Sequence, residues 1–157
     1  YLFFCCFNIN FCQAGENMAI KSMEKSFKSS LPNVKIAVDE ALTFVDSNIN
    51  NLSREDFFDL KLVLNELIIN AVIHGNNQDI TKKVSIYIEI QPENIIKTVI
   101  SDEGKGYNYE ELILKDNEEF SLDENGRGIS LVAALIDTLT FNDMGNVVKF
   151  TKKVRIK

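Results

Sequence analysis

The feature that most constrains the fold of this chain is the stretch of residues 57–76, which reads FFDLKLVLNELIINAVIHGN. Its apolar residues recur at the spacing of an α-helix, which turns by about 100° per residue. One face of that helix collects five candidate core residues: Leu60, Val63, Leu64, Leu67 and Ala71. Lys61 and Asn65 fall nearly opposite, where they can reach water. The pattern predicts a helix that packs against a core along one side.

Three polar residues interrupt this helix beside its core face. Glu66, Asn70 and His74 are spaced by four residues, so they form one stripe between apolar flanks. A carboxylate and an amide in such a position are costly to bury without partners. Either partners inside the protein satisfy these groups, or the stripe faces a ligand.

Length and composition narrow the class of protein. The 157 residues suit one domain, and a formal net charge of −6 argues against non-specific binding to nucleic acid or to an anionic membrane. The three cysteines, Cys5, Cys6 and Cys12, all lie near the start, so the rest of the chain has no disulfide framework and no cysteine metal site. We therefore expect a reducing, cytoplasmic setting.

Residues 1–23 are expected to form an N-terminal tail outside the fold, and residues 24–157 to form the domain. The start of the chain is uncharged, does not begin with methionine and is too short for a membrane span. No basic region precedes its apolar run, which disfavours a signal peptide. A shortened targeting segment and the edge of a fragment remain as explanations.

The domain is predicted to contain strands over residues 24–31, 82–91, 95–101, 138–142 and 147–153. Helices are predicted over residues 33–50 and 129–139, on either side of the long helix, which Ser53 caps and Gly75 ends. The acidic segment 107–125 has no clear period and is expected to be mobile. Tight turns between consecutive strands favour antiparallel pairing. We therefore expect a two-layer α/β sandwich with a mixed, mainly antiparallel sheet and helices on one face.

Two glycine-rich segments change the interpretation of the polar stripe. The first, DEGKG, runs from Asp102 to Gly106 at the end of a predicted strand. Gly104 and Gly106 permit positive φ and close approach of a ligand to the backbone. A strand-end aspartate can accept a hydrogen bond from an amino group such as that of adenine. An ordinary turn after a strand is the alternative.

The second segment, Gly126-Arg127-Gly128, directly precedes a predicted helix. Free backbone N–H groups at a helix N-terminus form an anion site, and Arg127 could add a charge-assisted bond to a phosphate. The alternative is a plain loop-to-helix turn with an exposed arginine.

The helix and the two glycine segments, in this order, resemble the GHKL (Bergerat-fold) ATP-binding domain of gyrase, heat-shock chaperones, histidine kinases and MutL. NELIINAVIHGN, ISDEGKGYN and ENGRGISLVAALID most resemble the small bacterial anti-sigma factor serine kinases. The resemblance covers roughly residues 24–154. It implies that Glu66 is the general base and that Asn70 coordinates Mg²⁺ near the phosphates of ATP. It also implies a lid over the phosphates, formed by Gly126, Arg127, Gly128 and the acidic segment.

At the other end of the nucleotide, the resemblance implies that Asp102 binds the adenine amine and that Gly104 and Gly106 shape that side of the site. The chain departs from the family where a threonine often follows the glycine before the last strand. Here Gly145 is followed by Asn146, whose amide can still hydrogen-bond near the adenine.

His74 is the one histidine of the chain, and it either caps or packs at the helix end or contacts phosphate. Histidine kinases need a phosphoacceptor histidine on a separate helix, which this sequence does not offer. The length also leaves no room for the additional domains of gyrase or MutL. A compact module is the expectation that remains.

The resemblance therefore implies an ATP- and Mg²⁺-dependent protein serine kinase. Its expected partners are a sigma factor or similar regulatory protein, which it binds, and a small antagonist protein, which it phosphorylates on serine. The family also allows a homodimer. Two alternatives are a nucleotide-dependent binding module without kinase activity and the catalytic fragment of a larger sensor kinase.

Overall fold

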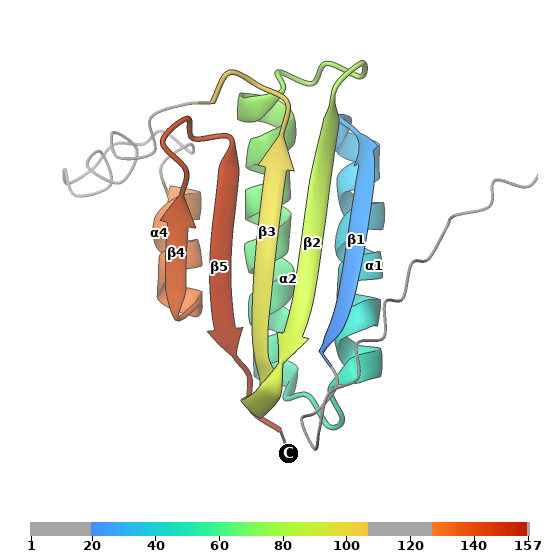
Figure 1. The fold of residues 1–157 in the computed structure, drawn as a ribbon, viewed down its shortest axis with the longest axis vertical. Helices are drawn as coiled ribbons and strands as arrows, with labels where there is room; N and C mark the ends of the chain where they lie inside the picture. Colours follow the sequence, from blue (N-terminus) through green and yellow to red (C-terminus); the bar gives the residue numbers. More distant parts are fainter. Residues whose placement is uncertain (1–19, 107–126, 157) are drawn as a thin grey trace, which may run out of the picture.

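The computed structural model describes residues 20–106 and 127–156 (Figure 1). In this part of the chain, five strands form one sheet in the order β1-β2-β3-β5-β4. Their bounds are β1 (Lys21–Lys28), β2 (Lys83–Gln91), β3 (Ile95–Asp102), β4 (Thr138–Phe141) and β5 (Val147–Lys153). All neighbouring strands are antiparallel, so the described sheet has none of the parallel pairing that a mixed sheet requires.

Helices α1 (Leu31–Asn48), α2 (Arg54–Asn70) and α4 (Arg127–Leu135) all lie on one face of the sheet (Figure 1). A short π-helical turn, η1 (Ala71–Gly75), extends α2. The predicted two-layer sandwich is confirmed. Among the described residues, no helix is long and apolar enough to cross a membrane.

The first strand and helix lie earlier in the chain than predicted. β1 begins at Lys21, so residues 21–23 belong to the fold, and the predicted domain boundary at residue 24 is wrong by three residues. Met23 on this strand is buried. α1 begins at Leu31 because Pro32 opens the helix, where its missing N–H is not needed, instead of closing the strand. Residues 1–19 lie outside the described part of the chain.

The hairpin from β2 to β3 follows the predicted alternation closely. Val84, Ile86, Ile88 and Ile90 are buried, and the single turn η2 (Pro92–Asn94) joins the two strands. The third helix was predicted too long. α4 ends at Leu135, because the chain must leave the helix for Thr138 to pair with Thr151 in the sheet.

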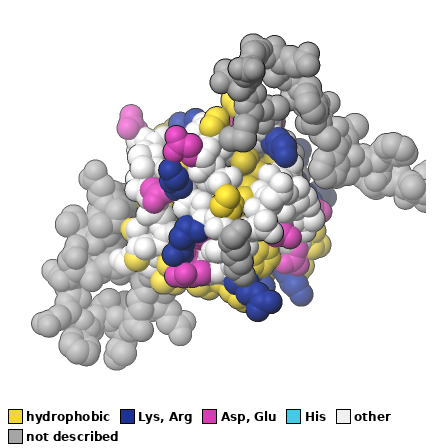
Figure 2. All heavy atoms as spheres, turned by 90° about the horizontal axis from the view of Figure 1, so that it is seen from below, with side chains coloured by type: hydrophobic (Ala, Val, Ile, Leu, Met, Phe, Trp, Pro, Cys, Tyr) yellow, Lys and Arg dark blue, Asp and Glu magenta, His cyan; other side chains and the backbone are white. Residues whose placement is uncertain are grey.

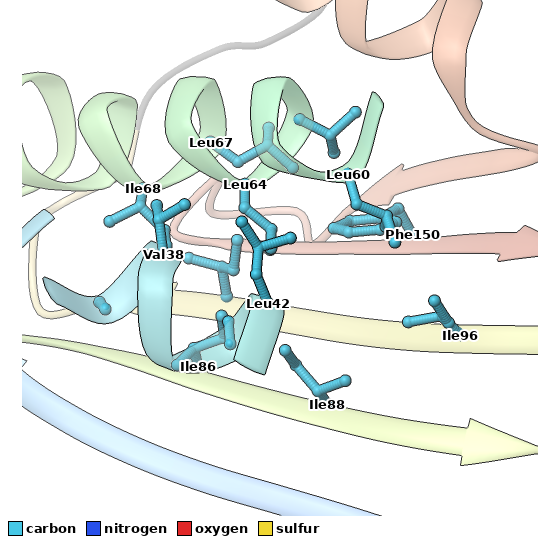
Figure 3. Close-up of a cluster of buried hydrophobic side chains, with 14 of the residues drawn as sticks. Val38, Leu42, Leu60, Leu64, Leu67, Ile68, Ile86, Ile88, Ile96 and Phe150 are labelled. Atoms are coloured by element: carbon cyan, nitrogen blue, oxygen red, sulfur yellow. The ribbon is translucent and has the colours of Figure 1, made fainter. Parts of the chain in front are cut away.

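The core fills the space between the sheet and the two long helices (Figure 3). All five predicted core residues of α2 and its extension are buried, from Leu60 to Ala71. They meet α1 residues such as Val38 and Leu42 and sheet residues such as Phe150. Burying a large aliphatic side chain contributes roughly 1.5–3 kcal/mol, so this apolar layer fixes α2 on the sheet.

A cluster of charged residues holds the N-terminal end of α2. Ser53 caps the helix as predicted: its Oγ accepts the N–H of Asp56 at 3.0 Å and donates to Asp56 Oδ2 at 2.8 Å. Asp56 also accepts the backbone N–H of Arg155 at 2.8 Å. Burial alone would raise the pKa of Asp56, but the hydrogen bonds from Arg155 and Ser53 and the charge of Lys152 outweigh it and lower the pKa to about 2.

Lys152 joins three elements at the same end of the molecule. This lysine is buried, and its Nζ lies 2.9 Å from Asp59 Oδ2 on α2 and 3.4 Å from Asp56 Oδ1. Nζ also donates to the carbonyl of Leu135 at 2.7 Å, at the end of α4. Figure 2, which views this end, shows basic and acidic side chains lying next to one another.

Candidate functional site

Glu66 and Asn70 lie one turn apart on α2, and both are half-buried. The first turn of α4 comes close to the Glu66 side chain at Gly128. A Cβ atom added at Gly128 would lie 2.6 Å from Glu66 Oε2, so a larger residue here would require the Glu66 carboxylate to move. The structure therefore brings the helix stripe and the second glycine segment together.

The helix changes its hydrogen-bond pattern just after Asn70. In η1 the backbone N–H of Asn76 donates to the carbonyl of Ala71 at 2.9 Å, a π-type bond. His74 lies within this π turn. His74 is exposed.

Asp102 ends β3 and is 7% exposed. Its Oδ1 accepts the backbone N–H of Gly104 at 2.8 Å. Burial raises the pKa of the Asp102 carboxyl, while the N–H of Gly104 and the charge of Lys82 offset part of that effect. A buried carboxylate with one oxygen already bonded within the protein is suited to accept one further hydrogen bond from a ligand.

Gly75, which the sequence predicts only as the end of the helix, is a residue of this site. A Cβ atom at Gly75 would lie 2.5 Å from Asp102 Oδ2 and 2.6 Å from Oδ1. A Cβ atom at Gly104 would in turn overlap the carbonyl oxygen of Gly75. The backbones of Gly75 and Gly104 therefore both lie against the Asp102 carboxylate. The signal in the sequence was the glycine that directly follows the polar stripe.

The end of η1 is held in place by Asn76, which is fully buried. Its Nδ2 donates to the carbonyl of Lys83 at 2.8 Å, at the start of β2. The backbone N–H of Gln78 donates to the carbonyl of Val72 at 2.8 Å. These bonds fix Gly75 against the strand end that carries Asp102.

Gly106 and Asn146 lie on the other side of Asp102. Gly106 has a φ of 76°, and a Cβ atom there would overlap the carbonyl oxygen of Met144. Asn146 Nδ2 donates to the carbonyl of Asp102 at 3.3 Å, and Asn146 O accepts the Asp102 N–H at 3.0 Å. The predicted residues Asp102, Gly106 and Asn146 are thus neighbours.

One helical segment connects the two ends of the site. Glu66 and Asn70 lie on α2, and the same helix continues through η1 to Gly75, beside Asp102. At a rise of about 1.5 Å per residue, the two ends are separated by on the order of 10 Å. An extended nucleoside triphosphate can span such a distance, with its base at Asp102 and its phosphates near Asn70.

Among the described residues, no group of three or more His, Cys, Asp or Glu side chains could hold a metal ion. Asn70 does offer one amide oxygen beside the carboxylate of Glu66. This arrangement fits Mg²⁺, which usually takes few protein ligands and is held largely by substrate phosphates and water.

Part of the predicted site lies outside the described residues, namely Gly126 and the acidic segment 107–125. Arg127 is the first residue of α4, and its side chain also lies outside the description.

Comparison with known proteins identifies the family of the chain. The family of the histidine kinase-like ATPase domain matches residues 31–152. The serine-protein kinase RsbW of Staphylococcus aureus, strain JH9, is 34% identical over 113 residues, which cover 64% of this chain and 68% of that protein. The protein of the same name in strain Newman gives the same values.

A solved structure of similar fold contains the RsbU and RsbW domains of Rv1364c from Mycobacterium tuberculosis. It superposes with a TM-score of 0.59 and 11% sequence identity, covering 85% of this chain and 32% of that chain. At this low identity the likeness concerns the fold.

Proposed function

Because the chain belongs to the family of the histidine kinase-like ATPase domain, we propose that it binds ATP and transfers the γ-phosphoryl group to a serine of a protein substrate. The observation that carries the proposal is the convergence of two glycine segments on one helix. Gly128 lies against Glu66 at one end of that helix, and Gly104 lies against Gly75 and Asp102 at the other.

In the proposed reaction, Asp102 accepts a hydrogen bond from the adenine amine, and the backbone N–H groups of the first turn of α4 face the phosphates. The substrate serine oxygen attacks the γ-phosphorus, Glu66 takes the hydroxyl proton, and the bond to the leaving ADP breaks. Asn70 would hold Mg²⁺, which when bound supplies neutralisation of the phosphate charge.

The proposed partners are those of an anti-sigma factor kinase: a sigma factor or similar regulatory protein, and a small antagonist protein that carries the phosphorylated serine. The 34% identity to the serine-protein kinase RsbW over 113 residues supports this choice. We place the activity in the cytoplasm, where ATP and such partners are present.

The test has two stages. Calorimetry should detect binding of Mg-ATP to the wild type, and Asp102→Ala should abolish it. Capture from the source cell with and without Mg-ATP, followed by mass spectrometry, should then identify a partner that gains phosphoserine. Binding of ATP without transfer to any captured partner would favour a nucleotide-dependent binding module. Failure of the wild type to bind ATP would refute the proposal.

A further inference from the structure

The turn of residues 142–146, between β4 and β5, contacts both ends of the first glycine segment. At one end, the backbone N–H of Asp102 donates to the carbonyl of Asn146 at 3.0 Å. At the other, Gly106 lies so close to the carbonyl of Met144 that a Cβ atom would overlap it. The conformation of residues 102–106 therefore depends on this turn.

Asn142 holds the turn in shape. Its Oδ1 accepts the backbone N–H groups of Asn146 and Val147, each at 3.0 Å. Its carbonyl accepts the N–H of Gly145 at 2.9 Å, and Gly145 supplies the φ of 75° that closes the turn. The side chain of Asn142 thus satisfies two backbone donors that the turn would otherwise leave to water.

The same side chain also orients its neighbour. Asn142 Nδ2 donates to Asn146 Oδ1 at 2.8 Å, while Asn146 Nδ2 donates to the carbonyl of Asp102 at 3.3 Å. Because Oδ1 of Asn146 is engaged by a donor, its amide is held in the orientation that presents Nδ2 to Asp102. A flipped amide would place two donors against each other at one end and two acceptors at the other.

We propose that Asn142 is a positioning residue for Asp102, and that through Asn146 it sets the place at which the Asp102 carboxylate meets the nucleobase. The inference rests on the proposed nucleotide site. Its functional consequence is selectivity for adenine over guanine. Adenine presents an amino group to an acceptor, whereas guanine presents a carbonyl oxygen at the corresponding position, which a well-placed carboxylate repels.

An exchange of side chains within the turn isolates this role. Asn142→Asp keeps an oxygen for the N–H groups of Asn146 and Val147 but removes the donor to Asn146 Oδ1. Combining it with Asp143→Asn, on an exposed neighbour, leaves the net charge unchanged. Asp143→Asn alone is the control. Asn146→Ala removes the side-chain amide that connects Asn142 to the carbonyl of Asp102, while leaving Asn142 in place.

Calorimetric titration with Mg-ATP and with Mg-GTP measures the selectivity. The double variant Asn142→Asp/Asp143→Asn should bind ATP about 3- to 10-fold more weakly than the wild type, which is the effect of losing one hydrogen bond, and should bind GTP with unchanged affinity. When Asn146→Ala is already present, adding Asn142→Asp and Asp143→Asn should not change the ratio of ATP affinity to GTP affinity any further. The control should behave as the wild type.

Amide hydrogen exchange of the nucleotide-free protein gives a second readout. In the double variant Asn142→Asp/Asp143→Asn, the Gly104 amide, which bonds to the Asp102 carboxylate, should exchange its hydrogen faster than in the wild type. The amide of Ile100, which lies earlier in β3, should exchange at the wild-type rate. An equal loss of ATP and GTP binding, or unchanged selectivity with unchanged exchange at Gly104, would overturn the inference and leave the proposed function intact. A wild type that binds no ATP would overturn both.

Discussion

The carboxylate of Glu66 lies against the backbone of Gly128, so closely that a methyl group on Gly128 would sit 2.6 Å from Oε2. The two residues come from α2 and α4, which are far apart in the sequence. Their contact places the proposed general base beside the N-terminus of the helix that is expected to face the phosphates.

Gly128→Ala tests this contact. The added methyl group should push the Glu66 carboxylate aside, and phosphoryl transfer should fall about tenfold or more, because the base loses its alignment. The melting temperature should stay within about 3 °C, since the glutamate can rotate and alanine favours a helix. Ala133→Ser, on the exposed side of α4, is the control for an added atom. Equal transfer rates in both variants would contradict the assignment.

Asp102→Asn separates binding from stability. Because burial raises the pKa of Asp102, its ionised form opposes folding at pH values above the pKa of the unfolded chain. The neutral amide should therefore leave the nucleotide-free protein as stable as the wild type, or more so, in urea unfolding at pH 7. Its Oδ1 can keep the bond to Gly104, which turns the amide donors toward the adenine amine. ATP affinity should fall about 30-fold or more; a smaller loss together with lower stability would contradict the account.

Asp56 should make the fold sensitive to acid. Its pKa of about 2 in the folded protein lies below the ordinary value of 3.8, so its contribution to stability is present above pH 3.8 and is lost as pH falls toward 2. The shift corresponds to about 2 kcal/mol. Urea unfolding between pH 5 and 2 should show this loss in the free energy of unfolding of the wild type. In Asp56→Asn, the free energy of unfolding should fall less over the same pH range, because the contribution of Asp56 is missing. Asp39→Asn, which removes an exposed carboxylate from α1, is the control; a variant at Asp56 with the wild-type pH profile would refute the prediction.

Lys152 and Lys153 are adjacent but should differ in their effect on stability. Lys152→Met leaves the carboxylate of Asp59 without its buried partner and should cost about 3–5 kcal/mol. Lys153→Met breaks only an exposed pair with Glu93 and should cost about 0–1 kcal/mol. Adding Asp59→Asn to Lys152→Met should restore part of the loss. Equal free energies of unfolding for the two lysine variants would show that the buried ion pair of Lys152 stabilises the fold no more than the exposed pair of Lys153.

Much of the fold follows from local patterns in the sequence. The core face of α2 and the buried residues of β2 were predicted correctly because helical and strand periodicities map directly onto burial. The cap at Ser53 and the turn at Pro92 were likewise set by local chemistry. The three site segments could be named because each carries an unusual residue type at a defined place.

The predictions that failed depend on contacts between distant residues. Pro32 suits both the end of a strand and the first turn of a helix, and packing of α1 selected the latter. The π turn at η1 is a choice of hydrogen-bond register that apolar spacing does not encode. The role of Gly75 became visible only when β3 brought Asp102 against it. Similarly, nothing in the local sequence of Asn142 indicates that it orients Asn146 toward Asp102.

We propose that Glu66 acts as a base on a nucleotide held by the rest of the site, and the rate of label transfer from γ-labelled ATP in Glu66→Gln measures this role. The glutamine keeps the shape of the side chain and removes its charge. With the antagonist protein captured from the source cell as substrate, we expect Mg-ATP affinity within about twofold of the wild type and transfer slower by about 10²–10⁴-fold. Transfer at the wild-type rate by a variant that binds ATP normally would contradict the account.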